Sequence, residues 1–457
     1  MQMPPRIDLT PYVQALTTRQ LVSTYGKVTK VVGLVVEADG ISAPVGELCH
    51  ILTQHTRIRA EVVGFDRDKL LLMPLGELRG IQPADRVVLI RSTLRVPVGA
   101  ELLGRVVDAL GTPIDAKGEL RNVEAYPVHN TPPNCYVRRR ISQILTTGVR
   151  GIDGLMTIGK GQRIGIFAGA GVGKSTLLGM IARFTDADVN VIALIGERGR
   201  EVREFIEDAL GDGLSRSVVV AATSDQSPLL RVQGALTATA IAEYFRAQGK
   251  DVVLMMDSVT RFAMAQREIG LSIGEPPTTR GYTPSVFSKM PMLMERAGTT
   301  NGDGSITGIY TILVEGDDMT EPVADAAKAI LDGHIVLSRA IAAQNQYPAI
   351  DVSNSLSRLM SEIVSPEHRK LANTFRQVLA DYEAIQDAYN IGAYTVGMNP
   401  RSDYAIAHIE KMRDFLRQDS KGVGFEETMA QLGNMFKTPP NGENARKQDE
   451  RKAGAKL

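Results

Sequence analysis

Between residues 163 and 184 the chain places glycines, a lysine and two hydroxyls in an order that can hold phosphate. The segment reads RIGIF, then AGAGVGKS, then TLLGMIARF, which predicts a strand, a glycine-rich loop and a helix. Backbone N–H groups of such a loop can point inward at phosphate, and the helix N-terminus adds partial positive charge. Lys174 would reach the outer phosphates and Ser175 would ligate Mg²⁺. The residues predicted to line this site are Gly169, Ala170, Gly171, Val172, Gly173, Lys174, Ser175 and Thr176.

Two carboxylates follow apolar runs that read as strands. Asp257 ends DVVLMMD, at the strand edge where ligands bind in open α/β sheets, and could hold a Mg²⁺ shell through water. Glu197 follows VNVIALIG and could orient or deprotonate an attacking water, while Arg198 could bind phosphate oxygens. Taken singly, Asp257 could instead cap a helix and Glu197 could be a surface residue. Their pairing with the phosphate loop favours nucleotide hydrolysis coupled to motion.

Composition limits the other classes. The 457 residues suggest about two to four domains. Lys+Arg and Asp+Glu are both 52, so net charge gives no argument for nucleic acid or an acidic membrane surface. The N-terminus has no signal pattern and no run of 18 or more apolar residues occurs, so we expect a cytoplasmic protein with at most a peripheral membrane role. Cys49 and Cys135 read as two buried, small apolar residues.

The pattern changes along the chain predict a multidomain protein. Short strands with turns over 24–95 indicate a small N-terminal β-barrel. Residues 96–150 read as connective, and from 151 onward apolar runs alternate with helical stretches, which indicates a mostly parallel sheet. We assign 96–360 to an α/β P-loop domain. Residues 361–435 read as an α-helical domain. Residues 1–23 read either as an amphipathic partner-binding segment or as a frayed terminus, and 436–457 as a disordered tail.

With these residues in view, the chain resembles the catalytic subunits of the rotary ATPase family over roughly residues 24–435. Within that family it is most similar to the type III secretion ATPases, above all the flagellar export branch. The matching motifs are TGVRGIDGLMTIGKGQRIGIFAGAGVGKST, IGERGREVREF, DSVTRFAMAQREIGLSIGEPPTTRGYTPSVF, DGHIVLSR and YPAIDVSNSLSR. The resemblance implies a RecA-like central domain, with ATP as substrate and Mg²⁺ as cofactor.

The resemblance also assigns roles to matching positions. It makes Glu197 the catalytic glutamate, and Arg261 the arginine that follows the Mg²⁺-shell Asp257. It makes Tyr347 the aromatic that stacks on adenine, and Arg358 an arginine finger that reaches the γ-phosphate in the neighbouring subunit. Without the resemblance, Tyr347 would read as an ordinary loop aromatic and Arg358 as a salt bridge at a helix start.

The implied machine is a homohexameric ATPase at the base of a flagellar export apparatus, peripherally attached to the inner membrane. The implied partners are a stator-like regulator at the N-terminal segment, a central-stalk-like protein, export-gate membrane proteins and chaperone–substrate complexes. An injectisome ATPase, a rotary ion-pump subunit and a Rho-type RNA translocase are the alternatives. The last would need aromatic residues on its barrel, where this chain has Phe65 and no Tyr between 26 and 95, so no nucleic acid is expected.

Overall fold

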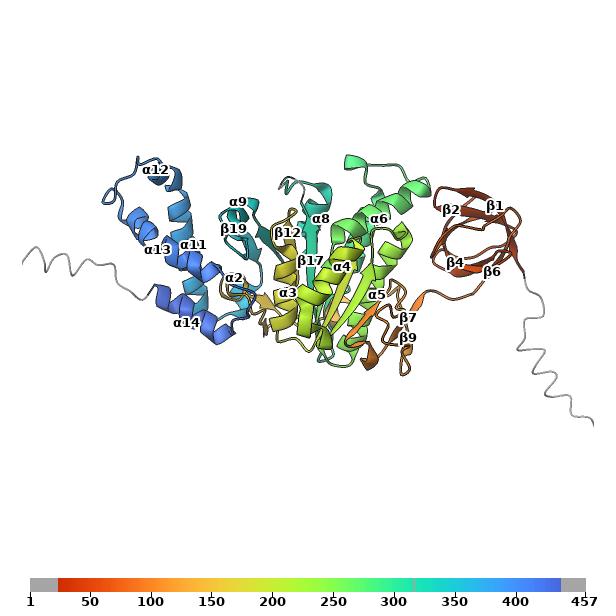
Figure 1. Ribbon diagram of the computed structural model, residues 1–457, viewed down its shortest axis with the longest axis horizontal. Coiled ribbons are helices and arrows are strands. Elements are labelled where there is room, and N and C mark those ends of the chain that lie inside the picture. The colour runs from red at the N-terminus through yellow and green to blue at the C-terminus, as the bar shows by residue number, and fades with distance from the viewer. Residues whose placement is uncertain (1–23, 315, 317, 437–457) are drawn as a thin grey trace, which may run out of the picture. The chain divides into compact units, whose positions relative to one another are not determined.

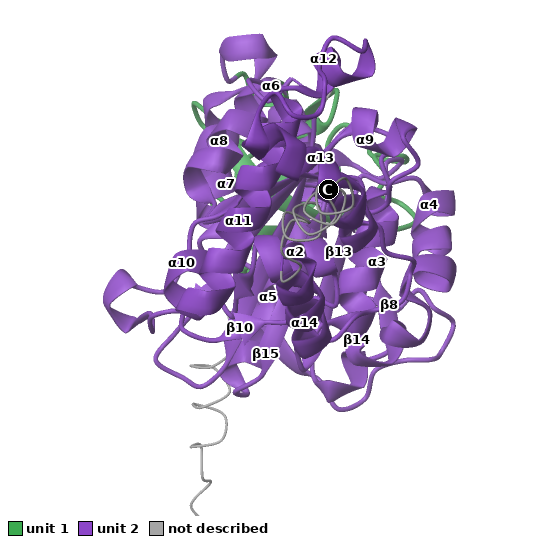
Figure 2. Ribbon diagram, turned by 90° about the vertical axis from the view of Figure 1, so that its left-hand side faces the viewer, with its two compact units in different colours: residues 1–94, 272–274 green, residues 95–271, 275–457 purple. Residues whose placement is uncertain are grey.

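The computed structural model describes residues 24–314, 316 and 318–436. The chain divides into two compact units, coloured separately in Figure 2, with one boundary between residues 94 and 95: the first unit also takes in residues 272–274, and the rest of the chain after residue 94 forms the second. The segment predicted over 1–23, and the predicted tail beyond residue 436, lie outside the described residues. Our proposed domain boundaries stay predictions.

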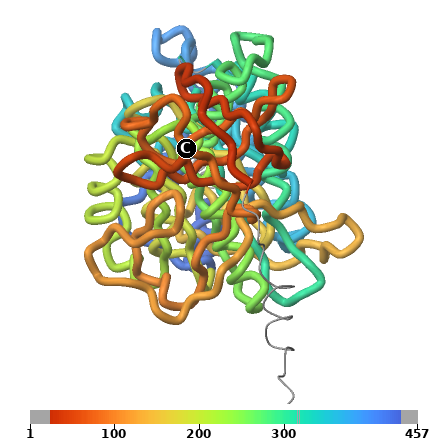
Figure 3. The backbone as a smooth tube through the Cα atoms, turned by 90° about the vertical axis from the view of Figure 1, so that its right-hand side faces the viewer, coloured from red at the N-terminus to blue at the C-terminus, as the bar shows by residue number. Residues whose placement is uncertain are grey.

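The first unit is a closed barrel with strand order β1-β2-β5-β4-β3-β6, traced in red and orange in Figure 3. Its neighbouring strands pair antiparallel, and apolar side chains alternate along them, so that one face of each strand fills the interior. The predicted small barrel is confirmed. Its strands are β1 (Gly26–Val32), β2 (Val35–Asp39), β3 (Leu48–Leu52), β4 (Arg57–Asp66), β5 (Lys69–Pro74) and β6 (Arg86–Leu89).

The second unit is built on a nine-stranded sheet with the order β19-β18-β12-β17-β15-β13-β14-β8, and β16 paired to β17 (Figure 1). The six strands from β18 to β14 pair parallel and β8 joins parallel at one edge, whereas β19 and β16 pair antiparallel. The mostly parallel sheet is therefore confirmed. Its strands are β8 (Arg105–Val107), β12 (Arg163–Ala168), β13 (Val189–Ile195), β14 (Ser217–Ala222), β15 (Asp251–Asp257), β16 (Gly298–Thr299), β17 (Ser305–Leu313), β18 (Gly333–Leu337) and β19 (Ile350–Ser357).

Every residue of β13 and β14 is buried, which requires cover on both faces of the sheet and explains their continuous apolar sequence. The second unit also contains two separate two-stranded sheets. They are β7 (Arg95–Val98) with β9 (Glu124–Pro127), and β10 (Ile144–Leu145) with β11 (Ile158–Gly159). The helices in the sheet region are α2 (Arg150–Leu155), α3 (Lys174–Phe184), α4 (Gly199–Glu204), α5 (Pro228–Ala247), α6 (Val259–Ser272), α7 (Pro284–Met294), α8 (Pro322–Ile330) and α9 (Arg339–Ala343).

The C-terminal part of the described chain is helical, as predicted. One continuous apolar core joins it to the sheet region, because Phe375 and Phe415 belong to the same buried cluster as Ile152 and Ile166. The helices are α10 (Met360–Ile363), α11 (Pro366–Glu383), α12 (Gln386–Asn390), α13 (Pro400–Leu416) and α14 (Phe425–Met435). No helix among the described residues is long and apolar enough to cross a membrane.

The two cysteines differ. Cys49 is buried in the barrel core, as predicted. The prediction for Cys135 is wrong, because that residue is exposed. It begins a short 3-10 turn, Cys135–Val137, in which the Asn134 side chain accepts the Tyr136 N–H, and none of the three residues is buried.

Candidate nucleotide site

The phosphate loop spans the gap between β12 and α3. Gly171 and Gly173 have φ values of 78° and 84°, in the left-handed region that glycine adopts without steric cost. Gly173 is the residue before α3, so the loop ends directly at the helix N-terminus, where Lys174 begins the first turn. Ser175 and Thr176 follow, both exposed. The predicted order of strand, loop and helix is present, and it presents N–H groups and the helix dipole to one spot.

Lys174 lies between the two predicted carboxylates. Its Nζ is 2.6 Å from Oδ1 of Asp257 and 3.6 Å from Oε1 of Glu197. All three side chains are largely buried, with 14, 5 and 16% exposure for Lys174, Asp257 and Glu197. The three groups come together because β13 and β15 are neighbours whose carboxyl ends meet at one edge of the sheet, with Leu194 paired to Asp257.

The surroundings of this cluster shift the pKa values of Glu197 and Lys174. Burial and the nearby negative charge of Asp257 raise the pKa of Glu197 to about 7, against the opposing effect of Lys174. Burial alone would lower the pKa of Lys174, but the charges of Asp257 and Glu197 more than offset it, so its pKa lies above the usual value. Lys174 therefore stays protonated, while Glu197 can exchange a proton near neutral pH, as a group that handles water's proton must.

The two predicted arginines differ in placement. The aliphatic stem of Arg261, on α6, packs against Gly196, next to Glu197, and a Cβ at Gly196 would lie 2.9 Å from Cβ of Arg261. Its Nε is buried without a hydrogen-bond partner, which leaves a donor available beside the carboxylates. Arg198 instead lies at the start of α4, 76% exposed, with its Nη1 3.5 Å from Oε1 of Glu201. The structure does not bring Arg198 to Lys174.

Tyr347 lies against the phosphate loop. Its ring atoms Cδ1 and Cε1 are 3.3 and 3.4 Å from the position that a Cβ of Gly173 would occupy. The side chain is 40% exposed, so part of the ring face is open to stack on a flat group held by the loop. The structure thus brings Tyr347 to the same place as Lys174.

Arg358 lies elsewhere. Strand β18 runs parallel to β12, and at the loop end Ala168 pairs with Leu337. At the other end of β18, Gly333 pairs with Ser357, the residue before Arg358. The exposed guanidinium donates to the Lys328 carbonyl at 3.3 Å. Arg358 is therefore at the far end of β18 from its own phosphate loop.

Two further side chains belong to this neighbourhood that sequence reasoning missed. Thr311, on the strand between β12 and β15, donates its hydroxyl to Oδ1 of Asp257 at 2.7 Å. Arg339, at the start of α9, lies across the loop, with Nε and Nη2 each 2.8 Å from where a Cβ on Gly169 would be. A basic residue directly after the strand-like run in DGHIVLSR was the available signal for Arg339; a threonine within an apolar strand gives none.

The oxygen donors fit a Mg²⁺ ion that arrives with a nucleotide. Asp257 and Glu197 offer carboxylate oxygens and Ser175 a hydroxyl, the ligand type that Mg²⁺ prefers. Among the described residues no group of three or more His, Cys, Asp or Glu side chains is close enough to hold a metal by itself. Phosphate oxygens and water would have to complete the coordination, which is the usual arrangement for Mg²⁺ bound with a nucleotide.

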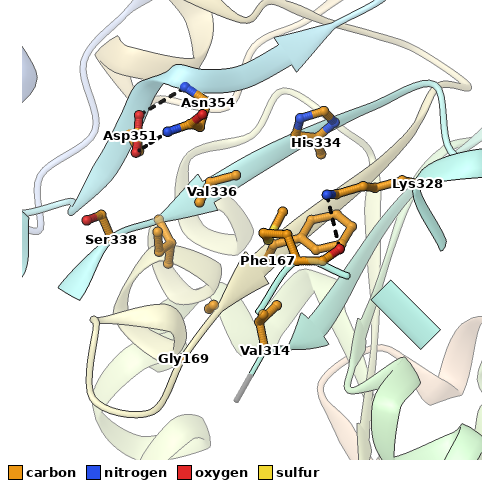
Figure 4. A pocket seen from close by; sticks show the side chains of 12 residues that line it. Phe167, Gly169, Val314, Lys328, His334, Val336, Ser338, Asp351 and Asn354 are labelled. Atoms are coloured by element: carbon orange, nitrogen blue, oxygen red, sulfur yellow. Dashed lines mark hydrogen bonds between the residues drawn. The ribbon is translucent and has the colours of Figure 1, made fainter. Parts of the chain in front are cut away.

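A cavity of about 370 Å³ opens beside the loop at Gly169 (Figure 4). Phe167 and His334, from β12 and β18, form part of its wall, with their rings 5.9 Å apart. Lys328 lies over the Phe167 ring and donates to the Met319 carbonyl at 3.3 Å. Neither Lys174, Glu197 nor Asp257 lines this cavity, so we place the chemistry at the loop and not here.

Comparison with known proteins agrees with this geometry. The ATP synthase alpha/beta family matches twice, with its β-barrel domain over residues 28–89 and its nucleotide-binding domain over residues 148–357. The T3SS EscN ATPase C-terminal domain matches residues 364–434.

Individual relatives cover most of the chain. It is 53% identical over 413 residues to a flagellum-specific ATP synthase of Bacillus subtilis, covering 89% of this chain and 94% of the relative. It is 51% identical over 431 residues to a type 3 secretion system ATPase of Xanthomonas euvesicatoria, covering 93 and 97%. The solved structure of assembled EscN, from enteropathogenic E. coli, superposes with a TM-score of 0.85 at 43% identity, covering 90% of this chain and 99% of EscN. With all three of its parts matched in order, the chain belongs to the ATP synthase alpha/beta family and groups there with the type III secretion ATPases.

Proposed function

We propose that the protein is the ATP-hydrolysing motor of a flagellar type III export apparatus, where it assists delivery of export substrates and their release from chaperones. The observation that carries the proposal is the buried cluster of Lys174, Glu197 and Asp257 at the phosphate loop. In it, Nζ of Lys174 lies 2.6 Å from Oδ1 of Asp257 and 3.6 Å from Oε1 of Glu197. That cluster supports hydrolysis of a nucleoside triphosphate. The relatives named as flagellum-specific ATP synthases support the flagellar assignment.

In this proposal each residue has one task. The loop N–H groups and Lys174 hold the phosphates, and Arg261 faces developing charge from beside Glu197. Glu197 orients a water for attack on the γ-phosphorus. A new P–O bond forms as the bond to the β–γ bridging oxygen breaks, and the water's proton passes to the Glu197 carboxylate. Ser175, and Asp257 through water, would hold a Mg²⁺ ion, which would supply neutralising charge at the phosphate oxygens.

The proposal includes a homohexameric ring. Arg358 lies at the far end of β18 from its own loop, so a finger role needs a neighbouring copy. The solved relatives include assembled EscN and EscN with its central stalk EscO, which supports self-association and a stalk-like partner here. We further propose a stator-like regulator at residues 1–23, export-gate membrane proteins and chaperone–substrate complexes as partners, with the ring at the cytoplasmic side of the inner membrane. All of the proposed catalytic groups belong to copies of this chain. The other partners would therefore regulate the hydrolysis cycle or deliver export substrates to it.

An injectisome role is the second candidate, because relatives named type 3 secretion system ATPases are about as similar as the flagellar ones. The chemistry would be the same and the exported proteins different. Only the identity of bound partners separates the two candidates.

The test uses tagged Glu197→Gln, which should bind ATP while hydrolysis falls by about 10²- to 10⁴-fold, the usual contribution of a general base. Capture from the native cell in ATP and Mg²⁺ should bring flagellar export components. The matched control is Glu204→Gln, an exposed carboxylate in the same segment that pairs with Arg200 and should hydrolyse ATP normally.

Three outcomes would contradict parts of the proposal. Undiminished hydrolysis in Glu197→Gln would remove Glu197 from the proposed role. Capture of needle-complex proteins would move the assignment to the injectisome. Capture of ion-pump subunits or RNA would place the same chemistry in a different machine.

A further inference from the structure

A hydrogen-bonded connection runs from the C-terminal helices to Tyr347. It begins at Gln418, two residues beyond the end of α13 and only 7% exposed. The backbone N–H of Gln418 donates to the Tyr347 carbonyl at 2.8 Å. These two residues are distant in sequence, so the bond joins the segment after α13 directly to the segment that carries the aromatic ring.

The side chain of Gln418 fixes where that N–H points. Its Nε2 donates to the carbonyls of Gly148 at 2.7 Å and Lys421 at 2.8 Å. Its Oε1 accepts the Arg150 N–H at 2.9 Å. Both donor hydrogens and the acceptor of one buried amide are thus used, which leaves the side chain a single orientation.

The segment that receives Gln418 is itself rigid. The fully buried Asp153 carboxyl accepts the N–H groups of Thr147 and Gly148 at 2.9 and 3.0 Å and the Thr147 hydroxyl at 2.7 Å. Gly148 has a φ of 75°, and a Cβ there would collide with Phe184 of α3. Gln418 is therefore held to a fixed point on the sheet region.

At the other end of the connection, the Tyr347 ring contacts the phosphate loop at Gly173, 3.3 Å from its would-be Cβ. The ring is 40% exposed, and among the residues that the structure describes no hydrogen bond restrains its hydroxyl. Its position depends on the loop at Gly173 and on the backbone that Gln418 holds. A shift in the segment after α13 would move the ring relative to the loop.

We propose that Gln418 is a positioning residue for nucleotide binding, through which the C-terminal helical region holds Tyr347 in place to stack on the base of the nucleotide. This inference rests on the proposed function, since it assumes that Tyr347 meets the base. Gln418 itself touches no nucleotide. It affects only the part of the binding energy that comes from the base, because Lys174 and the loop bind the phosphates.

The test compares two probes: ATP, and inorganic tripolyphosphate, which has phosphates but no base. Gln418→Ala should raise the KM and Kd for ATP about 5- to 30-fold, the range that one or two hydrogen bonds give, with kcat within about twofold. The inhibition constant of tripolyphosphate should stay unchanged. Gln418→Glu, which keeps the acceptor for Arg150 but turns both donors into acceptors, should lose as much affinity for ATP.

Gln431→Ala is the matched control. That glutamine also joins the helical region to Arg150, accepting from Nη1 at 2.9 Å, but it has no bond to Tyr347. It should bind ATP as the wild type does. Thermal unfolding of each variant, with ring assembly measured alongside, checks that the chain stays folded. In a Tyr347→Ala background, Gln418→Ala should cause no further loss, because its effect passes through that ring.

The possible failures are distinguishable. If Tyr347→Ala leaves ATP affinity unchanged, the assignment of Tyr347 to the base fails. If Tyr347→Ala weakens ATP while Gln418→Ala and Gln418→Glu do not, only the positioning role fails. Equal weakening of ATP and tripolyphosphate in Gln418→Ala would show a general loosening of the site and would overturn the inference. A normal ATP turnover in the wild type tests the proposed function independently of all three.

Discussion

At the residue scale, the buried carboxyl of Glu197 makes a prediction about pH. Burial and the charge of Asp257 raise its pKa to about 7. Below that pH the carboxyl holds a proton and cannot accept one from water; above it the carboxylate is free to do so. We expect kcat/KM for ATP, which reports the free enzyme, to fall about tenfold per pH unit below 7 and to level off above about 8.

Glu201 offers a way to move that profile. A hydrogen bond between the two carboxyl groups favours the protonated form of Glu197 and so raises the pKa of Glu197. A glutamine at 201 would donate to the Glu197 carboxylate and stabilise its charge. In Glu201→Gln the midpoint of the kcat/KM profile should therefore move to lower pH. A midpoint that stays in place would show that another group, and not Glu197, sets the pH dependence.

Whether a site residue could be predicted from the sequence depended on its position relative to the strands. Lys174, Glu197 and Asp257 could be placed together because each follows an apolar run, and parallel strands end at one edge. Thr311 could not, since it lies within a fully buried stretch where a threonine is indistinguishable from a valine by pattern. Gln418 could not, because three of its four bonds reach residues far away in sequence and no local rule relates them.

At the scale of elements, the loop between β12 and α3 contains two glycines that share a backbone conformation but differ in their contact with Tyr347. Gly171 and Gly173 both have left-handed φ values, but a Cβ on Gly171 would meet nothing within 4 Å, while one on Gly173 would meet Tyr347 at 3.3 Å. Alanine at either position should cost about 1 kcal/mol in the free energy of unfolding, from backbone strain. Both should weaken binding of ATP and tripolyphosphate, and Gly173→Ala should weaken ATP more, because it also displaces the ring.

The matched control for this comparison is Gly249→Ala. Gly249 has a φ of 78° in open space, at the turn between α5 and β15, away from the loop. It should lose similar stability in chemical denaturation while binding both probes normally. If Gly173→Ala and Gly171→Ala weaken ATP and tripolyphosphate by the same ratio, Tyr347 does not contribute through its contact with Gly173.

The elements themselves were largely predictable, and their connections were not. Continuous apolar runs marked β12 to β15 and β17, and alternating runs marked the barrel, because burial on two faces or one leaves a direct imprint on sequence. The stretch 96–150 read as connective. It nevertheless supplies β8 at the sheet edge, a three-residue strand too short to show a period. The common core of the helical region and the sheet depends on long-range packing, which local periodicity does not encode.

At the scale of the whole molecule, the proposed mechanism requires one chain to carry both halves of a catalytic site that it cannot assemble alone. Glu197 lies at the loop edge of the sheet, whereas Arg358 follows β19 at the opposite end of β18. Two equivalent copies placed head to tail can bring the Arg358 of one to the loop of the next. Such a heterologous contact closes into a ring when the rotation allows it. Activity should then depend on assembly and rise with protein concentration.

Mixing two inactive variants tests that arrangement. Arg358→Ala keeps Glu197 but lacks the finger, and Glu197→Gln keeps the finger but lacks the carboxylate, so each alone should lose about 10²-fold or more in kcat. In mixed rings, an Arg358→Ala subunit whose neighbour is Glu197→Gln regains a complete site. Random assembly at equal concentrations gives about one quarter of all interfaces this composition, and so up to about one quarter of wild-type activity if sites act independently. Arg369→Ala, an exposed arginine on α11, serves as the control that should be active by itself. If Arg358 acted within its own chain, neither variant would hold both groups and the mixture would stay as inactive as its components.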